Sequence, residues 1–157
     1  MKIVLIQVGK TSAKYLIEGI QHYNSKTSRM VNFETITIPD VKNRGALTQA
    51  EQKKSEGARI LEKISAGDLT ILLDERGEQY DSIKFAEYIE SLMINGLKKL
   101  NFVIGGPYGF SDDVYEMANK KVSLSRMTFS HQMVRLLFAE QLFRCFTLIK
   151  GIPYHNE

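Results

Sequence analysis

Apolar residues follow two different spacings along the chain, and the two spacings alternate. Short apolar or β-branched runs, which are typical of strands, occur at residues 2–8, 33–38, 69–73, 100–104 and 122–127. Apolar residues at three- and four-residue spacing, which predict helices, follow after residues 11–12 and over 48–67, 82–95, 111–119 and 129–149. Strand and helix therefore alternate five times. This order predicts an α/β fold with a parallel sheet and helices on both faces.

Local signals predict several helix and strand ends. Thr11 or Ser12 is expected to cap the first helix, because a hydroxyl accepts a hydrogen bond from the free N–H groups of a first turn. The run Thr48–Glu51 fits a capping box, in which the first and last side chains each bind the other's backbone N–H. Gly67 is expected to end that helix, and Asp74–Gly77 is interpreted as the turn that closes the third strand.

The last helix is apolar on more than one side. Phe138, Leu142, Cys145, Phe146 and Ile149 make one stripe, and Leu136, Leu137, Phe143 and Leu148 occupy other sides. In a small chain such a helix needs cover from its own sheet and from a second surface. We expect a homodimer to supply that second surface.

His131 and Arg135 lie one turn apart beside this stripe, and two interpretations of them are open. In the structural one, Arg135 pairs with a carboxylate or a helix end at an interface, and His131 is a satisfied residue of the first turn. In the functional one, Arg135 holds a substrate phosphate or carboxylate at the dimer cleft. Cys145 is expected to be a thiol of the core.

Composition and charge exclude several classes of protein. With 157 residues, 43% of them hydrophobic and 25% charged, we expect one globular domain over residues 1–157. No apolar run approaches a membrane span or a signal peptide, so we expect a cytoplasmic protein. One cysteine and three separated histidines predict neither an internal disulfide nor a metal site. The net charge of +3 is only a mild bias toward phosphate-bearing partners.

Three segments that follow strands are candidates for a binding site. They are residues 74–77, 105–109 and 124–129, and ligands of parallel sheets bind beyond the carboxyl ends of the strands. Gly105–Gly109 contains three glycines and allows a close approach of the backbone to a ligand. It lacks the spacing of the dinucleotide fingerprint. A tight strand-to-helix turn and a nucleotide loop therefore both remain open.

Three runs resemble a known family: IGGPYG at Ile104–Gly109, LSRMTFSHQMVRLLFAEQLFR at Leu124–Arg144, and PYH at Pro153–His155. With the length and the opening strand, they closely resemble the bacterial RlmH family of the SPOUT superfamily over the whole chain. The resemblance implies a Rossmann-like, mostly parallel sheet of five or six strands with a C-terminal trefoil knot. It further implies a homodimer that uses S-adenosyl-L-methionine (SAM) to methylate N3 of a pseudouridine in 23S ribosomal RNA, on assembled ribosomes.

The resemblance also implies functional residues. The SAM contacts of the family fall on Leu73, Gly105, Leu124, Ser125, Arg126, Met127, Thr128 and Phe129. Arg135, Tyr154 and His155 are the candidates for assisting the loss of the N3 proton, and the two tail residues would reach the partner subunit's pocket.

Two positions depart from the family pattern. Ser130 stands where many relatives have proline, which puts the start of the last helix in question, and Asn156 stands where a basic residue often follows. A non-catalytic ribosome-binding or assembly protein of the same fold is the main alternative. A nicotinamide-dependent oxidoreductase is the second, and the missing fingerprint argues against it.

Overall fold

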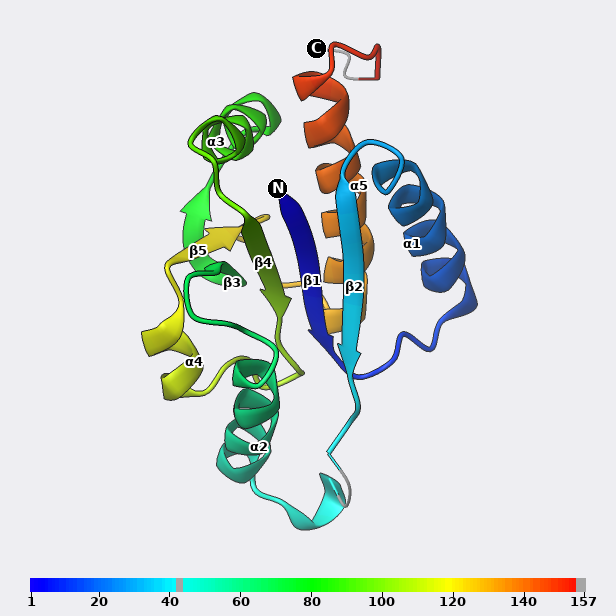
Figure 1. The fold of residues 1–157 in the computed structure, drawn as a ribbon. Coiled ribbons are helices and arrows are strands. Elements are labelled where there is room, and N and C mark those ends of the chain that lie inside the picture. The colour runs from blue at the N-terminus through cyan, green and yellow to red at the C-terminus, as the bar shows by residue number, and fades with distance from the viewer. Residues whose placement is uncertain (42–43, 155–157) are drawn as a thin grey trace.

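The centre of the molecule is a sheet of five parallel strands, in a computed structural model that describes residues 1–41 and 44–154. The strand order is β2-β1-β4-β3-β5, and every pairing between neighbours is parallel (Figure 1). The predicted parallel α/β sheet is therefore confirmed. The strands are β1 (Lys2–Val8), β2 (Asn32–Ile38), β3 (Leu69–Gln79), β4 (Lys99–Ile104) and β5 (Lys120–Ser123).

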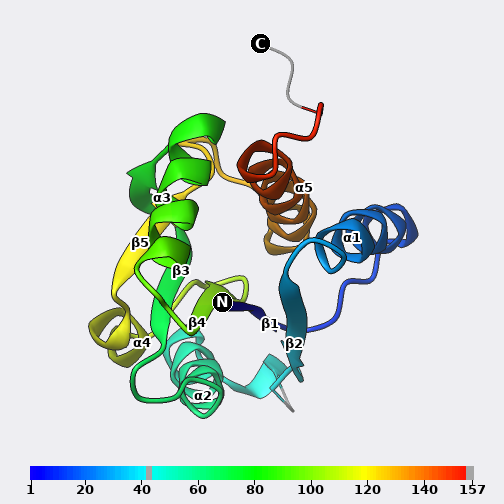
Figure 2. The ribbon, with the colours of Figure 1, turned by 45° about the horizontal axis from the view of Figure 1, so that its top comes forward.

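Helices cover both faces of this sheet, as predicted. One face carries α1, α3 and α5, and the opposite face carries α2 and α4 (Figure 2). A single turn of 3-10 helix, η1 (Arg44–Ala46), precedes α2. The helices are α1 (Lys14–Thr27), α2 (Gln49–Leu61), α3 (Ser82–Ile94), α4 (Asp112–Met117) and α5 (His131–Ile149).

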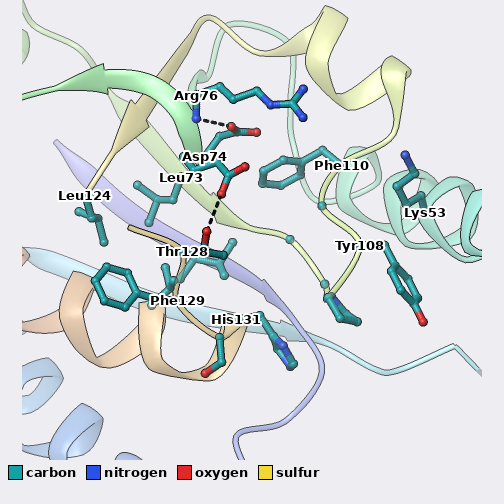
Figure 3. A pocket seen from close by; sticks show the side chains of 18 of the residues that line it. Lys53, Leu73, Asp74, Arg76, Tyr108, Phe110, Leu124, Thr128, Phe129 and His131 are labelled. Carbon is teal, nitrogen blue, oxygen red and sulfur yellow. Dashed lines mark hydrogen bonds between the residues drawn. The ribbon is translucent and has the colours of Figure 1, made fainter. Parts of the chain in front are cut away.

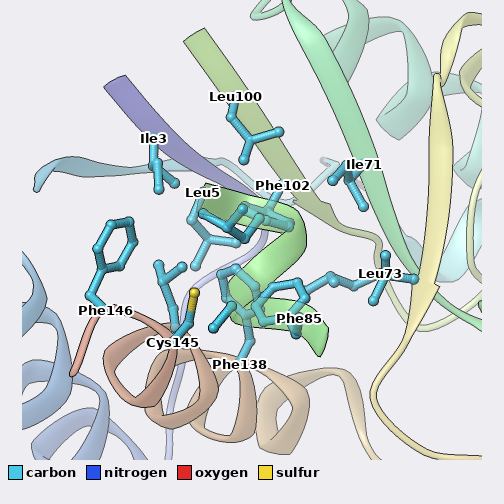
Figure 4. Close-up of a cluster of buried hydrophobic side chains, with 14 of the residues drawn as sticks. Ile3, Leu5, Ile71, Leu73, Phe85, Leu100, Phe102, Phe138, Cys145 and Phe146 are labelled. Atoms are coloured by element: carbon cyan, nitrogen blue, oxygen red, sulfur yellow. The ribbon is translucent and has the colours of Figure 1, made fainter. Parts of the chain in front are cut away.

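The interior strand β1 shows why the sheet is buried on both faces. Successive side chains of a strand point to opposite faces, so Ile3 and Leu5 enter the core under α3 and α5. Val4 and Ile6 enter the second core, under α2 and α4. All four side chains are almost fully buried, which explains why the run is continuously apolar instead of alternating. Figure 4 shows the larger core, in which aromatic side chains of α3, α5 and β4 meet.

The second apolar side of α5 is covered by α1 of the same chain. Leu136 lies so close to Gly19 of α1 that a Cβ there would come within 2.8 Å of it. The Phe143 ring lies 5.9 Å from the ring of Tyr23, also on α1. The sequence argument assumed that only a second chain could cover the other apolar sides of α5. Because α1 of the same chain covers one of them, the apolar surface of α5 does not by itself require a dimer, and the homodimer stays a prediction.

The helix starts confirm one expected cap and correct another. The capping box of α2 is present, with Glu51 N donating to Thr48 Oγ1 at 3.2 Å and Thr48 N donating to Glu51 Oε2 at 2.8 Å. The expected cap of α1 at Thr11 or Ser12 is wrong, because that helix starts after Ala13 without a side-chain cap. Both hydroxyls instead bind side chains of α5.

The second helix also ends earlier than expected. It ends at Leu61 and not near Gly67, because the N–H groups of Lys63 and Ile64 bond carbonyls only three residues back. Such bonds tighten the last turn and stop the helix.

The ends of two strands differ from the sequence prediction. The third strand does not stop in a turn at 74–77: β3 runs on to Gln79, and both Leu73 and Glu78 pair with Val122. The intervening residues form a bulge. The fifth strand was expected over 122–127, but β5 ends at Ser123. The Ser123 hydroxyl donates to the Ser125 carbonyl, and Met127 N donates to Ser125 Oγ. Beyond Ser123, hydrogen bonds with serine side chains therefore take the place of the backbone hydrogen bonds between strands.

Candidate functional site

A pocket of about 670 Å³ lies where the three predicted loops meet, at the carboxyl ends of β3, β4 and β5 (Figure 3). The bulge of β3, the glycine loop after β4 and the bend before α5 each supply part of its wall. The convergence predicted from the sequence is therefore confirmed in geometry. The first turns of α2 and α5, and Tyr115 of α4, complete the lining.

Most of the residues expected to contact SAM line this pocket. Those that do so are Leu73, Gly105, Leu124, Ser125, Met127, Thr128 and Phe129. Arg126 is the exception: its side chain is exposed and does not contribute to the wall. Figure 3 places Leu73, Leu124 and Phe129 together as an apolar side of the pocket.

The glycine loop Gly105–Gly109 is a tight turn pressed against α2. Gly109 has φ of 80°, a left-handed conformation that favours glycine, and its N–H donates to the carbonyl of Gly106 at 3.1 Å. A Cβ on Gly106 would lie 2.3 Å from a carboxylate oxygen of Glu56. Glu56 is buried and accepts a hydrogen bond from Gln52 through its other oxygen. Glycine is thus favoured at 106, because any larger side chain would overlap the buried Glu56 carboxylate against which the loop packs.

The bulge of β3 is held in place by close backbone contact and by hydrogen bonds. A Cβ on Gly77 would lie 2.6 Å from backbone atoms of Lys121 and Val122 in β5, so only glycine lets the bulge approach. Asp74 accepts hydrogen bonds from the N–H of Arg76 at 2.8 Å and from the hydroxyl of Tyr115 at 2.5 Å. Burial, together with the bond to Asp74, raises the pKa of Tyr115 to about 12, so the phenol stays a donor.

The bend before α5 is linked to the bulge and ends in a true helix cap. The Thr128 hydroxyl donates to Glu75 at 3.4 Å, which joins two walls of the pocket. Ser130 accepts a hydrogen bond from Met133 N at 3.2 Å, so α5 starts at His131, two residues later than expected. Serine therefore starts the helix where many relatives were expected to use proline.

Arg135 lies behind the pocket and does not line it. Its side chain is fully buried and donates to the Thr11 hydroxyl at 2.9 Å and to the carbonyl of Val8. Burial lowers the pKa of the guanidinium. Arg135 thus links α5 to the end of β1. The sequence interpretations had proposed a carboxylate, a helix end or a substrate anion as its partner, and not a strand carbonyl.

Tyr154 lies at the opposite end of α5 from the pocket. Its hydroxyl donates to Glu140 at 3.2 Å, its ring packs 4.7 Å from the Phe143 ring, and the Arg144 guanidinium lies 4.9 Å from its centre. Burial, with a hydrogen bond to Tyr23 and the charge of Glu140, raises the pKa of Tyr154. His155 and Asn156 fall outside the described residues.

The described residues offer neither a reactive thiol nor a cluster of metal ligands. Cys145 is buried, as expected, and burial raises the pKa of its thiol to about 12. Over residues 1–41 and 44–154, no group of three or more potential ligand side chains is placed to hold a metal ion. No helix within these ranges has the length and apolar character of a membrane span.

The segment 74–77 was a candidate from its place after a strand, and its charged residues Asp74, Glu75 and Arg76 line the pocket, in a bulge and not in the expected turn. Lys53 and Tyr115 also line the pocket, but they lie on helices outside the three candidate segments. For Lys53 and Tyr115 no local signal existed.

Comparison with known proteins identifies the family. A family model described as "Predicted SPOUT methyltransferase" matches residues 1–155. The chain is also 50% identical to "Ribosomal RNA large subunit methyltransferase H" of Christiangramia forsetii, over the full length of both chains. The chain belongs to the RlmH family of SPOUT methyltransferases. An equally full-length match, at 48% identity, is the protein of the same name from Parabacteroides distasonis.

Two solved structures share the fold of this chain. A probable methyltransferase from Bordetella pertussis superimposes with a TM-score of 0.54 at 14% identity, covering 92% of this chain and 94% of that one. A probable methylase family protein from Haemophilus influenzae gives 0.51 at 14% identity, covering 99% and 70%. The family resemblance drawn from the motifs is confirmed, and the trefoil knot stays a prediction. Membership of this RlmH family argues against the nicotinamide-dependent alternative.

Proposed function

We propose that this protein transfers a methyl group from SAM to N3 of a pseudouridine in large-subunit ribosomal RNA, acting as a homodimer on assembled ribosomes. The observation that carries the proposal is the pocket: three strand-end loops converge on it, and seven of the eight residues expected to contact SAM line it. Relatives about half identical over their whole length bear the name of a large-subunit ribosomal RNA methyltransferase.

The pocket suits SAM in size and in the character of its walls. Its volume of about 670 Å³ falls within the range of pockets that enclose ligands of this size. Leu73, Leu124 and Phe129 would pack against the adenosine body, and the glycine loop would let backbone groups approach the ribose. Main-chain groups of the bend at 124–129 would bind the polar edge of the adenine.

The chemistry requires positioning more than activation. The sulfonium of SAM supplies an electrophilic methyl group and a good leaving group. The walls of the pocket would hold that methyl in line with the ring nitrogen, and such positioning lowers the barrier by making the reaction effectively unimolecular. The acceptor nitrogen must lose its proton, and Tyr154 and His155 are our candidates for assisting that loss. Arg135 would act through position, by fixing α5 against the end of β1.

We propose that the tail serves the pocket of another subunit. Tyr154 follows the last turn of α5 and its hydroxyl reaches back only to Glu140, whereas the pocket of the same chain lies at the first turn of that helix. A twofold partner that packs along α5 would bring the end of one helix to the start of the other. Half-buried Leu137 and exposed Met127 and Phe129 offer apolar surface for that contact.

Methyl transfer tests the main proposal directly. Purified protein is incubated with methyl-labelled SAM and 70S ribosomes from a strain that lacks its own enzyme of this family, and the labelled nucleotide is then mapped. We expect label on one pseudouridine of the large-subunit RNA. A protein that binds ribosomes but neither binds SAM in calorimetry nor transfers label is the non-catalytic alternative, and this result would refute the enzyme.

Mixing two inactive variants tests whether the tail acts on the partner. Leu124→Arg places a charge in the pocket wall and leaves the tail intact. Tyr154→Ala removes the aromatic side chain of the tail and leaves the pocket wall intact. If the tail acts between subunits, a co-refolded equal mixture recovers about a quarter of the wild-type rate, because half of the dimers are mixed and each has one complete site. Recovery that does not exceed the sum of the two variants would show that the tail serves its own chain or none.

A further inference from the structure

One edge of the pocket is basic and aromatic, and the proposed SAM contacts make no use of it. It consists of Lys53 from α2, Arg76 from the bulge of β3 and Tyr108 from the glycine loop. Arg76 is exposed, Tyr108 is 44% exposed and Lys53 is half-buried. In Figure 3, Lys53 and Tyr108 lie across the pocket from Leu124 and Phe129, so the edge faces the apolar wall.

In the described part of the chain neither cation of this edge forms an ion pair, although Asp74 and Glu75 precede Arg76 in the sequence. Over residues 1–41 and 44–154, the side chains of Lys53 and Arg76 take part in neither an ion pair nor a hydrogen bond. The two acidic groups beside them are bound to other donors, Asp74 to the Tyr115 hydroxyl and Glu75 to that of Thr128. The edge therefore presents two free cations to a ligand.

Tyr108 offers an aromatic face next to these cations. In the described part of the chain its ring makes no aromatic or cation–π contact, unlike Tyr80, Tyr88, Tyr115 and Tyr154. The loop that carries it is fixed by the backbone bond between Gly109 and Gly106 and by the contact of Gly106 with buried Glu56. An exposed ring on a fixed loop is a suitable stacking platform.

We infer that Lys53, Arg76 and Tyr108 bind the single-stranded RNA that flanks the target nucleotide. Proteins hold single-stranded RNA by combining cations that track the phosphates with aromatic rings on which bases stack. Lys53 and Arg76 contact phosphates, and Tyr108 stacks on a base next to the one inserted into the pocket. This inference rests on the proposed function, because it places the RNA at the mouth of the same pocket.

The salt dependence of binding tests the phosphate contacts. Labelled Lys53→Gln protein is titrated with 70S ribosomes between about 50 and about 200 mM salt, with Lys54→Gln as matched control. Lys54 is the next residue of the same helix, is exposed and does not line the pocket. Loss of one contact to single-stranded RNA should reduce the slope of log affinity against log salt by about 0.7 for Lys53→Gln only. Equal slopes for the two variants would overturn the inference.

Stacking is tested at Tyr108 in the same titration. Tyr108→Leu should weaken binding roughly tenfold, Tyr108→Phe should restore it, and Tyr15→Leu, at an exposed tyrosine of α1, should have no effect. Failure of phenylalanine to restore binding would overturn the stacking role.

SAM titration separates this inference from the proposed function. The affinity of Lys53→Gln and Tyr108→Leu for SAM should equal that of the wild type. A parallel loss of SAM affinity would assign these residues to the donor site and refute an RNA edge. Because the assay measures binding, ribosome binding that depends on Lys53 without methyl transfer would support the edge while refuting the enzyme.

Discussion

Gly77→Ala is the sharpest test of how the site is built. The added Cβ would lie 2.6 Å from three backbone atoms of β5, which cannot rotate away as a side chain could. To relieve the overlap, β5 must separate from β3 beyond the bulge, where Glu78 pairs with Val122 and Gln79 pairs with Ser123. Loss of these pairings, at about 1 kcal/mol per hydrogen bond, together with overpacking, should lower the free energy of unfolding by about 2–3 kcal/mol.

The same change should disturb SAM binding, because Gly77 joins two walls of the pocket. Gly77 belongs to the bulge of β3, which forms one wall, and it touches β5, which leads through Ser123 into the bend that forms the other wall. A shift of about 1 Å in the second wall should weaken SAM binding at least about tenfold. Urea denaturation and calorimetry measure the two effects. Gly45→Ala is the control, since among the described residues, its two chain neighbours apart, no atom lies within 4 Å of a Cβ there. If both variants unfold alike and bind SAM alike, the contact does not determine the site.

Three further predictions follow from buried contacts. Gly106→Ala should weaken SAM binding and lower the free energy of unfolding by about 1–2 kcal/mol, because the added Cβ would overlap the Glu56 carboxylate. Adding Glu56→Ala to the same chain should recover most of the lost stability, and additive effects in the double-mutant cycle would disprove the contact. Arg135→Met leaves a buried carbonyl without its donor and should cost about 2–4 kcal/mol in denaturation, whereas a fully stable but inactive variant would indicate catalysis. Burial favours a higher pKa for Asp68, but its bonds, foremost that from Lys99, hold the pKa below 3.8. The stability advantage of the wild type over Asp68→Asn, measured by urea denaturation, should therefore persist at neutral pH and be lost as the pH falls through the lowered pKa; an unchanged advantage at low pH would contradict this.

The fold was predictable because its signals are local and strong. The run at residues 3–6 is apolar at four successive positions, which is typical of a strand covered on both faces. The box at Thr48 and Glu51 needs no tertiary information either, since both partners lie within one turn.

The details that were missed depend on distant contacts. Residues 74–77 carry turn-forming residues, and only the approach of Gly77 to β5 makes them a bulge. The end of β5 is decided by two serine side chains that bind the backbone in place of a neighbouring strand. Arg135 finds its carbonyl partner 127 residues earlier in the chain. Lys53 joins the pocket only because the strand order places α2 beside the glycine loop.

The place of β1 between β2 and β4 also governs how the protein can form during synthesis. Lys2 pairs on one side with Asn32, but on the other with Lys99, which leaves the ribosome much later. The core that receives Ile3 and Leu5 is completed only when the final helix has emerged. Folding dominated by such long-range pairings is slow, and a nascent chain that stalls before residue 131 leaves an apolar surface open to chaperones and proteases. An incomplete chain therefore exposes apolar surface that the complete chain buries.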